Sequence, residues 1–155
     1  AQAMAIKADV SNGRLVEDMF LRVEDRLGPV DLLVNNAGIA FKGLLTDTRD
    51  EDWARLMAVN LTGPFLCSRR ALPAMISKRF GPSGITVNAI APGPVLTDML
   101  CRDMDEGEMG DLLSLLPVGR WGQPEDIARA CLFLLSPQNS FVNGSVLALD
   151  GGWKA

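Results

Sequence analysis

A strand–helix–strand pattern fills the first part of the sequence and restricts the fold more than any other feature. Residues 4–8 and 31–34 are short, mostly apolar stretches, typical of buried strands. Between them, apolar residues recur at helical spacing over residues 14–27, and Gly28 and Pro29 end the predicted helix. Joints this short require parallel strands with a right-handed crossover. The sequence therefore predicts an α/β fold built on a parallel sheet.

The second predicted strand ends abruptly in a turn. Two asparagines, an alanine and a glycine follow it, at positions 35–38. Asn and Gly tolerate unusual backbone angles and supply turns. In open α/β sheets, ligands bind at the carboxyl ends of strands. This stretch indicates either a ligand-binding turn or a loop that only ends a strand.

A long helix is predicted from residue 50 toward residue 79. One of its faces carries Trp53, Leu56, Met57 and Asn60. Asn60 is thus polar on an apolar face, and burying an amide is costly unless it is hydrogen-bonded. Pro64 has no N–H, so it would leave the Asn60 carbonyl without its helical partner and kink the helix. Asn60 is either a functional residue or a structural asparagine beside a proline kink.

The second half of the chain predicts two more strands, at residues 84–91 and 144–149. The first of these breaks at Pro92, Gly93 and Pro94. Residues 99–116 mix acids, glycines and apolar residues, which favours a mobile lid of short helices. A further helix opens at Pro124, with acids near its positive end. No internal repeat or second domain is indicated.

Composition excludes several classes of function. The chain has 15 Lys and Arg against 19 Asp and Glu, a net charge of −4, and no basic stripe that would bind nucleic acid. No apolar run is long enough to span a membrane, and residues 1–5 do not read as a signal peptide. The three cysteines fit no disulfide framework or zinc pattern, so we expect a reducing, cytoplasmic compartment. With no histidine or tyrosine, a Ser-His-Asp triad, a histidine metal site and a phenolic acid/base are excluded, and we predict no metal.

Five segments in order resemble the short-chain dehydrogenases/reductases. They are Asp9-Val10 after a strand, Asn35-Asn36-Ala37-Gly38, Asn60 within Val-Asn-Leu-Thr-Gly-Pro-Phe, Pro92-Gly93 followed by Thr97, and the tail Val-Leu-Ala-Leu-Asp-Gly-Gly-Trp. The similarity covers nearly all 155 residues. Within the family, the chain looks most like the bacterial β-ketoacyl-acyl-carrier-protein reductases. The resemblance implies a doubly wound, Rossmann-like parallel sheet, of which the chain holds one partial domain over residues 1–155.

The resemblance also implies a site. Asp9 would accept a hydrogen bond from the adenine amino group, and the Val10 backbone would bond the ring. Asn36, Ala37 and Gly38 would run beside the adenosine ribose, while Asn35 would brace neighbouring strands. The turn at Pro92 and Gly93, the Val95 backbone and the Thr97 hydroxyl would hold the nicotinamide. The catalytic helper would be Asn60, whose carbonyl would hold a water in a proton relay.

The implied activity is hydride transfer with NADP or NAD, NADP being slightly favoured. The carbonyl substrate would be a small molecule or an acyl thioester, foremost a 3-oxoacyl thioester, reduced to an alcohol by a homotetramer. Sugars, steroids or modified lysine side chains are alternative substrates. A different reading is a catalytically incompetent remnant that acts only as a binding or assembly module.

Two pieces of the family pattern have no counterpart in the sequence. One is the opening βαβ unit with its Gly-rich pyrophosphate turn. The other carries the catalytic serine and the Tyr-x-x-x-Lys pair, for which there is no room between the long helix and residue 84. The family sheet runs in the order 3-2-1-4-5-6-7, so strands 1, 2 and 5 would be absent. We therefore expect the chain to be an incomplete record of a longer protein, with a discontinuity between Arg79 and Pro82.

Overall fold

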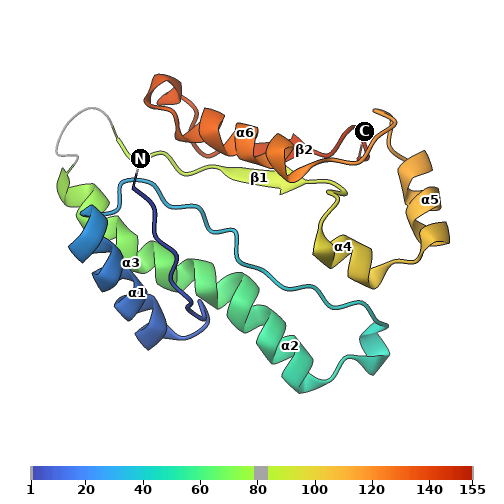
Figure 1. The fold of residues 1–155 in the computed structure, drawn as a ribbon, viewed down its shortest axis with the longest axis horizontal. Coiled ribbons are helices and arrows are strands. Elements are labelled where there is room, and N and C mark those ends of the chain that lie inside the picture. Colours follow the sequence, from blue (N-terminus) through green and yellow to red (C-terminus); the bar gives the residue numbers. More distant parts are fainter. Residues whose placement is uncertain (1, 79–83, 155) are drawn as a thin grey trace. The chain divides into compact units, whose positions relative to one another are not determined.

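The computed structural model describes residues 2–78 and 84–154 (Figure 1). The chain divides into two compact units, which we call unit 1 (Ala1–Ile85) and unit 2 (Thr86–Ala155). The predicted discontinuity between Arg79 and Pro82 lies outside the described residues. No helix in the described ranges is both long and apolar enough to cross a membrane.

Unit 1 is built from two helical segments. α1 (Gly13–Leu27) is capped by Asn12, whose side chain accepts hydrogen bonds from the N–H groups of Arg14 and Leu15, and the helix ends at Gly28, with φ 86°. The second segment comprises α2 (Asp50–Met57), the π-helix η2 (Ala58–Thr62) and α3 (Gly63–Lys78), preceded by the 3-10 turn η1 (Leu45–Asp47). Both predicted helices are thereby confirmed.

α1 and α3 lie side by side and enclose the core of unit 1 (Figure 1). The buried side chains of this core are Val16, Phe20, Cys67 and Ala71. Arg70 on α3 ties the pair together: its Nε donates to Glu17 at 2.9 Å and its Nη2 to Glu24 at 2.7 Å, while its guanidinium lies over the Phe20 ring. These ion pairs are partly exposed, so the apolar contacts carry most of the stabilisation.

The helix break predicted from Pro64 takes the form of the π-helix η2. The N–H of Gly63 donates to the carbonyl of Ala58, five residues earlier, instead of four. One wide turn thus absorbs the missing proline N–H without ending the helix. Such turns are frequent at functional sites.

The prediction that residues 4–8 and 31–34 form strands is wrong. Both segments are free of regular secondary structure. A strand forms only where its backbone groups find a partner, and the strands that would flank these two in the family sheet have no counterpart in the sequence. Leu32 and Val34 are accordingly about half exposed, at 55% and 51%.

Unit 2 contains the two-stranded parallel sheet of the described residues. β1 (Ala89–Pro92) pairs with β2 (Val146–Leu149), with Ala89 opposite Val146 and Pro92 opposite Leu149. α6 (Pro124–Leu135) packs on β1 and is followed by the 3-10 turn η3 (Pro137–Asn139). α4 (Asp98–Asp103) and α5 (Glu106–Ser114) are the short helices predicted for residues 99–116, and the role of this segment as a lid remains a prediction.

β1 is shorter than the predicted strand at residues 84–91. The segment just before β1 pairs partly through side chains: the Val87 N–H donates to the Asn143 side chain and the Ser145 N–H to the Asn88 side chain, while the Val87 carbonyl accepts from the Gly144 N–H. Side-chain oxygens thus take two of the positions at which backbone carbonyls would extend the strand. The predicted last strand is confirmed, starting two residues later than expected.

Candidate functional site

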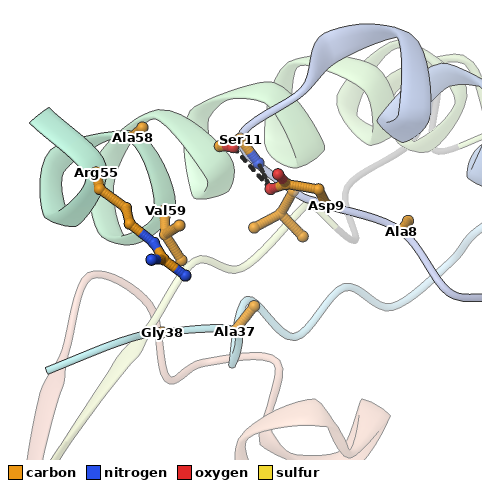
Figure 2. Close-up of a pocket in the computed structure, with 9 residues that line it drawn as sticks. Ala8, Asp9, Ser11, Ala37, Gly38, Arg55, Ala58 and Val59 are labelled. Carbon is orange, nitrogen blue, oxygen red and sulfur yellow. Dashed lines mark hydrogen bonds between the residues drawn. The ribbon is translucent and has the colours of Figure 1, made fainter. Parts of the chain in front are cut away.

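Unit 1 contains an open pocket of about 440 Å³ (Figure 2). Three segments meet there: the loop before α1, the turn after residue 34, and the junction of α2 with η2. The lining residues are Ala8, Asp9, Val10, Ser11, Ala37, Gly38, Arg55, Ala58 and Val59. Four residues predicted from the sequence for the adenosine side, Asp9, Val10, Ala37 and Gly38, therefore lie together. Asn36 is not among the lining residues.

Asp9 is held in place by a local turn. Its Oδ1 accepts from the Ser11 N–H at 2.9 Å and from the Ser11 hydroxyl at 2.7 Å. These hydrogen bonds, the hydroxyl first, lower the pKa of Asp9 below its usual value, and Arg55 adds a smaller through-space effect. Its Oδ2 has no partner among the described residues and remains a free acceptor.

Val10 is fixed by close packing against the start of α3. Gly63 is buried, and a Cβ at this position would lie 2.8 Å from Cγ2 and 3.2 Å from Cβ of Val10. Only a residue without a side chain allows this approach, because the Val10 side chain is branched and stiff. The end of η2 therefore sets the position of one pocket wall.

Asn60 fixes the opposite wall. Its Nδ2 donates to the Ile39 carbonyl at 2.8 Å, and the Ile39 N–H donates to its Oδ1 at 2.9 Å. This pair of bonds clamps the backbone directly after Gly38. The residue is exposed rather than buried, but both polar ends of its amide are bonded. The catalytic role of Asn60 remains a prediction.

Asn35 braces unit 1 in a way that differs from the expected one. Its Nδ2 donates to the hydroxyl of Ser68 on α3 at 3.1 Å. The asparagine therefore bonds the turn to a helix, since residues 31–34 pair with no strand in the described part of the chain.

The other predicted residues belong to unit 2. Pro92 ends β1, and Gly93 donates its N–H to the Leu149 carbonyl at 3.1 Å. Val95 forms a parallel bridge with Gly122. The Thr97 hydroxyl caps α4 by accepting from the Leu100 N–H at 3.4 Å, so its own proton remains free to be donated.

Sequence reasoning missed three pocket residues on the long helix, Arg55, Ala58 and Val59. Their spacing of i, i+3 and i+4 places them on one helix face, which was visible in the sequence. This face meets the turn at Ala37 and Gly38 through a long-range contact. The spacing of apolar residues along the sequence gives no information about such a contact. No group of three or more metal-ligating side chains occurs in the described parts of the chain.

Comparison with known proteins identifies the family of the chain. Residues 1–82 match the family model described as short chain dehydrogenase, and residues 75–154 match the model described as enoyl-(acyl carrier protein) reductase. The whole chain is 38% identical over 199 aligned positions to the inactive 2-(S)-hydroxypropyl-CoM dehydrogenase 2 of Xanthobacter autotrophicus, of which 86% is covered. The chain belongs to the short-chain dehydrogenase/reductase family.

Other members of the short-chain dehydrogenase/reductase family share most of the chain. A 3-oxoacyl-acyl-carrier-protein reductase of Haemophilus influenzae is 32% identical, with 93% of this chain and 75% of that protein covered. A blue fluorescent protein from a metagenomic library, solved in complex with NADPH, is 31% identical with a TM-score of 0.85, over 97% of this chain and 76% of its own. The fold is therefore the Rossmann-like α/β fold of the family, of which this chain contains part.

Proposed function

We propose that the pocket of unit 1 binds the adenosine half of NADP or NAD. The single observation that carries this proposal is the convergence of Asp9, Val10, Ala37 and Gly38 on one pocket. The residues fit such a group chemically. Asp9 Oδ2 is a free acceptor for an exocyclic amino group, apolar walls suit the face of a purine, and Gly38 permits close backbone approach.

For the nicotinamide half, the family resemblance is the support. The Val95 backbone and the free Thr97 proton would hold the carboxamide, and the turn at Pro92 and Gly93 would position both. When bound, the dinucleotide supplies a hydride to a carbonyl carbon or accepts one from an alcohol. NADP is favoured over NAD, supported by the family resemblance and by two similar structures described with NADPH and with NADP.

The proposed reaction is reduction of a carbonyl, with a 3-oxoacyl thioester as the foremost substrate. Similar proteins named 3-oxoacyl-acyl-carrier-protein reductase and acetoacetyl-CoA reductase support this choice. Met104 and Met109, half-buried on the segment of α4 and α5, are flexible apolar side chains that suit an acyl chain. A homotetramer and a cytoplasmic location complete the proposal, the latter supported by three cysteines that form no disulfide.

A second candidate function is binding or assembly without chemistry. It is favoured by one observation: the 155 residues contain no tyrosine, so the Tyr-x-x-x-Lys acid/base pair is missing. One of the similar proteins is itself named as inactive.

We propose a chain discontinuity between Arg79 and Pro82 as the origin of the missing segment. Two observations support it. The two family models change over between residues 75 and 82. An alignment of 199 positions to a chain of 155 residues also leaves stretches of the relative without a counterpart.

Intact mass and turnover together test these proposals. We expect a chain of exactly these residues to bind NADP without oxidising NADPH in the presence of an acetoacetyl thioester, because no group would protonate the alkoxide. We expect a heavier natural protein, carrying the missing segment, to turn over. Turnover by the 155-residue chain would contradict the assignment of the acid/base pair, and a heavier protein that is inert with both NADPH and NADH would favour the binding module.

The lowered pKa of Asp9 predicts a flat pH dependence of nucleotide binding. A lowered carboxyl pKa means that the acceptor stays ionised through the ordinary aspartate range and is lost only as pH falls through the lowered value. The affinity for NADP, measured by calorimetry, should therefore stay constant from about pH 8 to about pH 5 with respect to this group. Asp9→Asn should bind more weakly at every pH. A decline of the wild type between about pH 7 and about pH 5, absent in Asp9→Asn, would contradict the lowered pKa of Asp9. Equal affinity of the wild type and Asp9→Asn for NADP would contradict the role of Asp9 in binding.

A further inference from the structure

Two charged side chains share the pocket of unit 1, and only one of them has been given a role. Of the lining residues, Asp9 and Arg55 are the charged ones. Arg55 comes from α2, and Figure 2 shows its guanidinium extending toward the segment that carries Ala37 and Gly38. Asp9 enters from the loop before α1. The pocket thus presents an anionic acceptor from one segment and a cationic donor from another.

The Arg55 guanidinium makes no hydrogen bond or ion pair with any described residue. The acid one turn before it, Asp52, is already held by Arg49 through two bonds of 2.7 and 3.0 Å. Asp9 is close enough for Arg55 to influence its pKa, yet the two form no ion pair. Arg55 therefore stabilises the described part of the fold through no hydrogen bond or ion pair. All its N–H donors and its planar face remain available at the pocket.

The chemistry of the pocket indicates what Arg55 contacts. A second charge of opposite sign, Asp9, stands in the same pocket and would repel a phosphate. A neutral, flat, polar group avoids this repulsion and suits both side chains. A guanidinium is planar and weakly hydrated, and it stacks on aromatic faces.

We propose that Arg55 binds the adenine ring by lying against its face while Asp9 accepts from its amino edge. The inference rests on the proposed binding of NADP or NAD in this pocket. It assigns Arg55 as a cofactor-binding residue that recognises the base rather than a phosphate.

The test measures nucleotide affinity of the full chain and of Arg55→Met. Titration with NADP, NAD and adenosine 5′-monophosphate should show dissociation constants raised by roughly 3- to 30-fold for all three, as expected for loss of a cation–π contact. NADP and NAD should lose affinity by the same factor, because both carry the same base. The matched control is Arg22→Met on α1, which removes the same charge from an exposed ion pair with Asp18 outside the pocket and should bind as wild type does.

A second variant, Arg55→Lys, separates shape from charge. It keeps the charge and loses the planar face, so we expect its affinities to remain below those of the wild type. Both Arg55 variants should melt at the wild-type temperature, since Arg55 bonds to no described residue.

The outcomes distinguish this inference from the proposed function. Wild-type protein that binds none of the three nucleotides would overturn the proposed function. Wild-type binding with an unaffected Arg55→Met would overturn the inference alone. A loss confined to NADP, or full rescue by lysine, would show a charge contact to phosphate and also overturn it.

Discussion

Gly93→Ala is expected to lower the free energy of unfolding of unit 2 by about 2–3 kcal/mol, near the upper end for overpacking. A Cβ at this position would lie 2.6 Å from both Cα and Cβ of Asp150 and 2.9 Å from its carbonyl oxygen. Two of these atoms belong to the backbone, so no rotamer change relieves the clash. The chain must instead part where the Gly93 N–H donates to the Leu149 carbonyl, at the ends of β1 and β2.

Thermal unfolding and amide hydrogen exchange measure this effect. Exchange should accelerate in β1 and β2, whose ends the substitution forces apart. Gly110→Ala is the matched control: it makes the same change on α5, where nothing lies within 4 Å of the new Cβ. The control should be neutral or stabilising by up to about 1 kcal/mol, as expected in a helix interior. If the two variants were equally stable, the close approach of Gly93 to Asp150 would not limit the stability of unit 2.

Asn60→Leu is expected to lower the free energy of unfolding of unit 1 by about 1–3 kcal/mol, because two hydrogen bonds to the backbone are lost. Leucine has nearly the same shape as asparagine, but it can neither accept from the Ile39 N–H nor donate to the Ile39 carbonyl. The turn that carries Ala37 and Gly38 then loses its anchor on η2. If binding must restore that turn, NADP affinity should fall by roughly 5- to 150-fold.

The comparison that isolates this clamp is Asn35→Leu. Asn35 lies on the same turn but makes a single bond, to the Ser68 hydroxyl, and does not line the pocket. Its replacement should lower stability by about 0.5–1.5 kcal/mol and leave NADP affinity close to that of the wild type. If both variants lost affinity equally, general loosening of unit 1 rather than the contact with Ile39 would explain the loss.

Local signals were sufficient to predict the helices. α1 begins at a capping asparagine and ends at a glycine, both of which are readable in the sequence. Pro64 predicted the interruption of the long helix, because a missing N–H is a property of the residue itself. Asn60 drew attention for the same reason: an amide on an apolar helix face needs partners wherever the chain places it.

Strands and pocket walls were harder to predict. Residues 4–8 and 31–34 have strand-like composition, but pairing needs a neighbour that the local sequence does not supply. β1 and β2 do pair, since each finds the other across more than fifty residues. Arg55 could not be predicted as a pocket residue, because its place in the pocket depends on the contact between α2 and the turn at Ala37 and Gly38.

The helices, the break at Pro64, the family and the residue types available for a nicotinamide cofactor could all be predicted from the sequence. These follow from periodicity, caps and ordered motifs, all of which act over short spans of chain. Which segments meet is seen only in the folded chain: Asn60 bonds a residue 21 positions away, and the Val10 side chain packs against Gly63. Such contacts form because a wide π-turn brings one helix face to two loops at once, and hydrogen bonding and close packing across that distance leave no local signature.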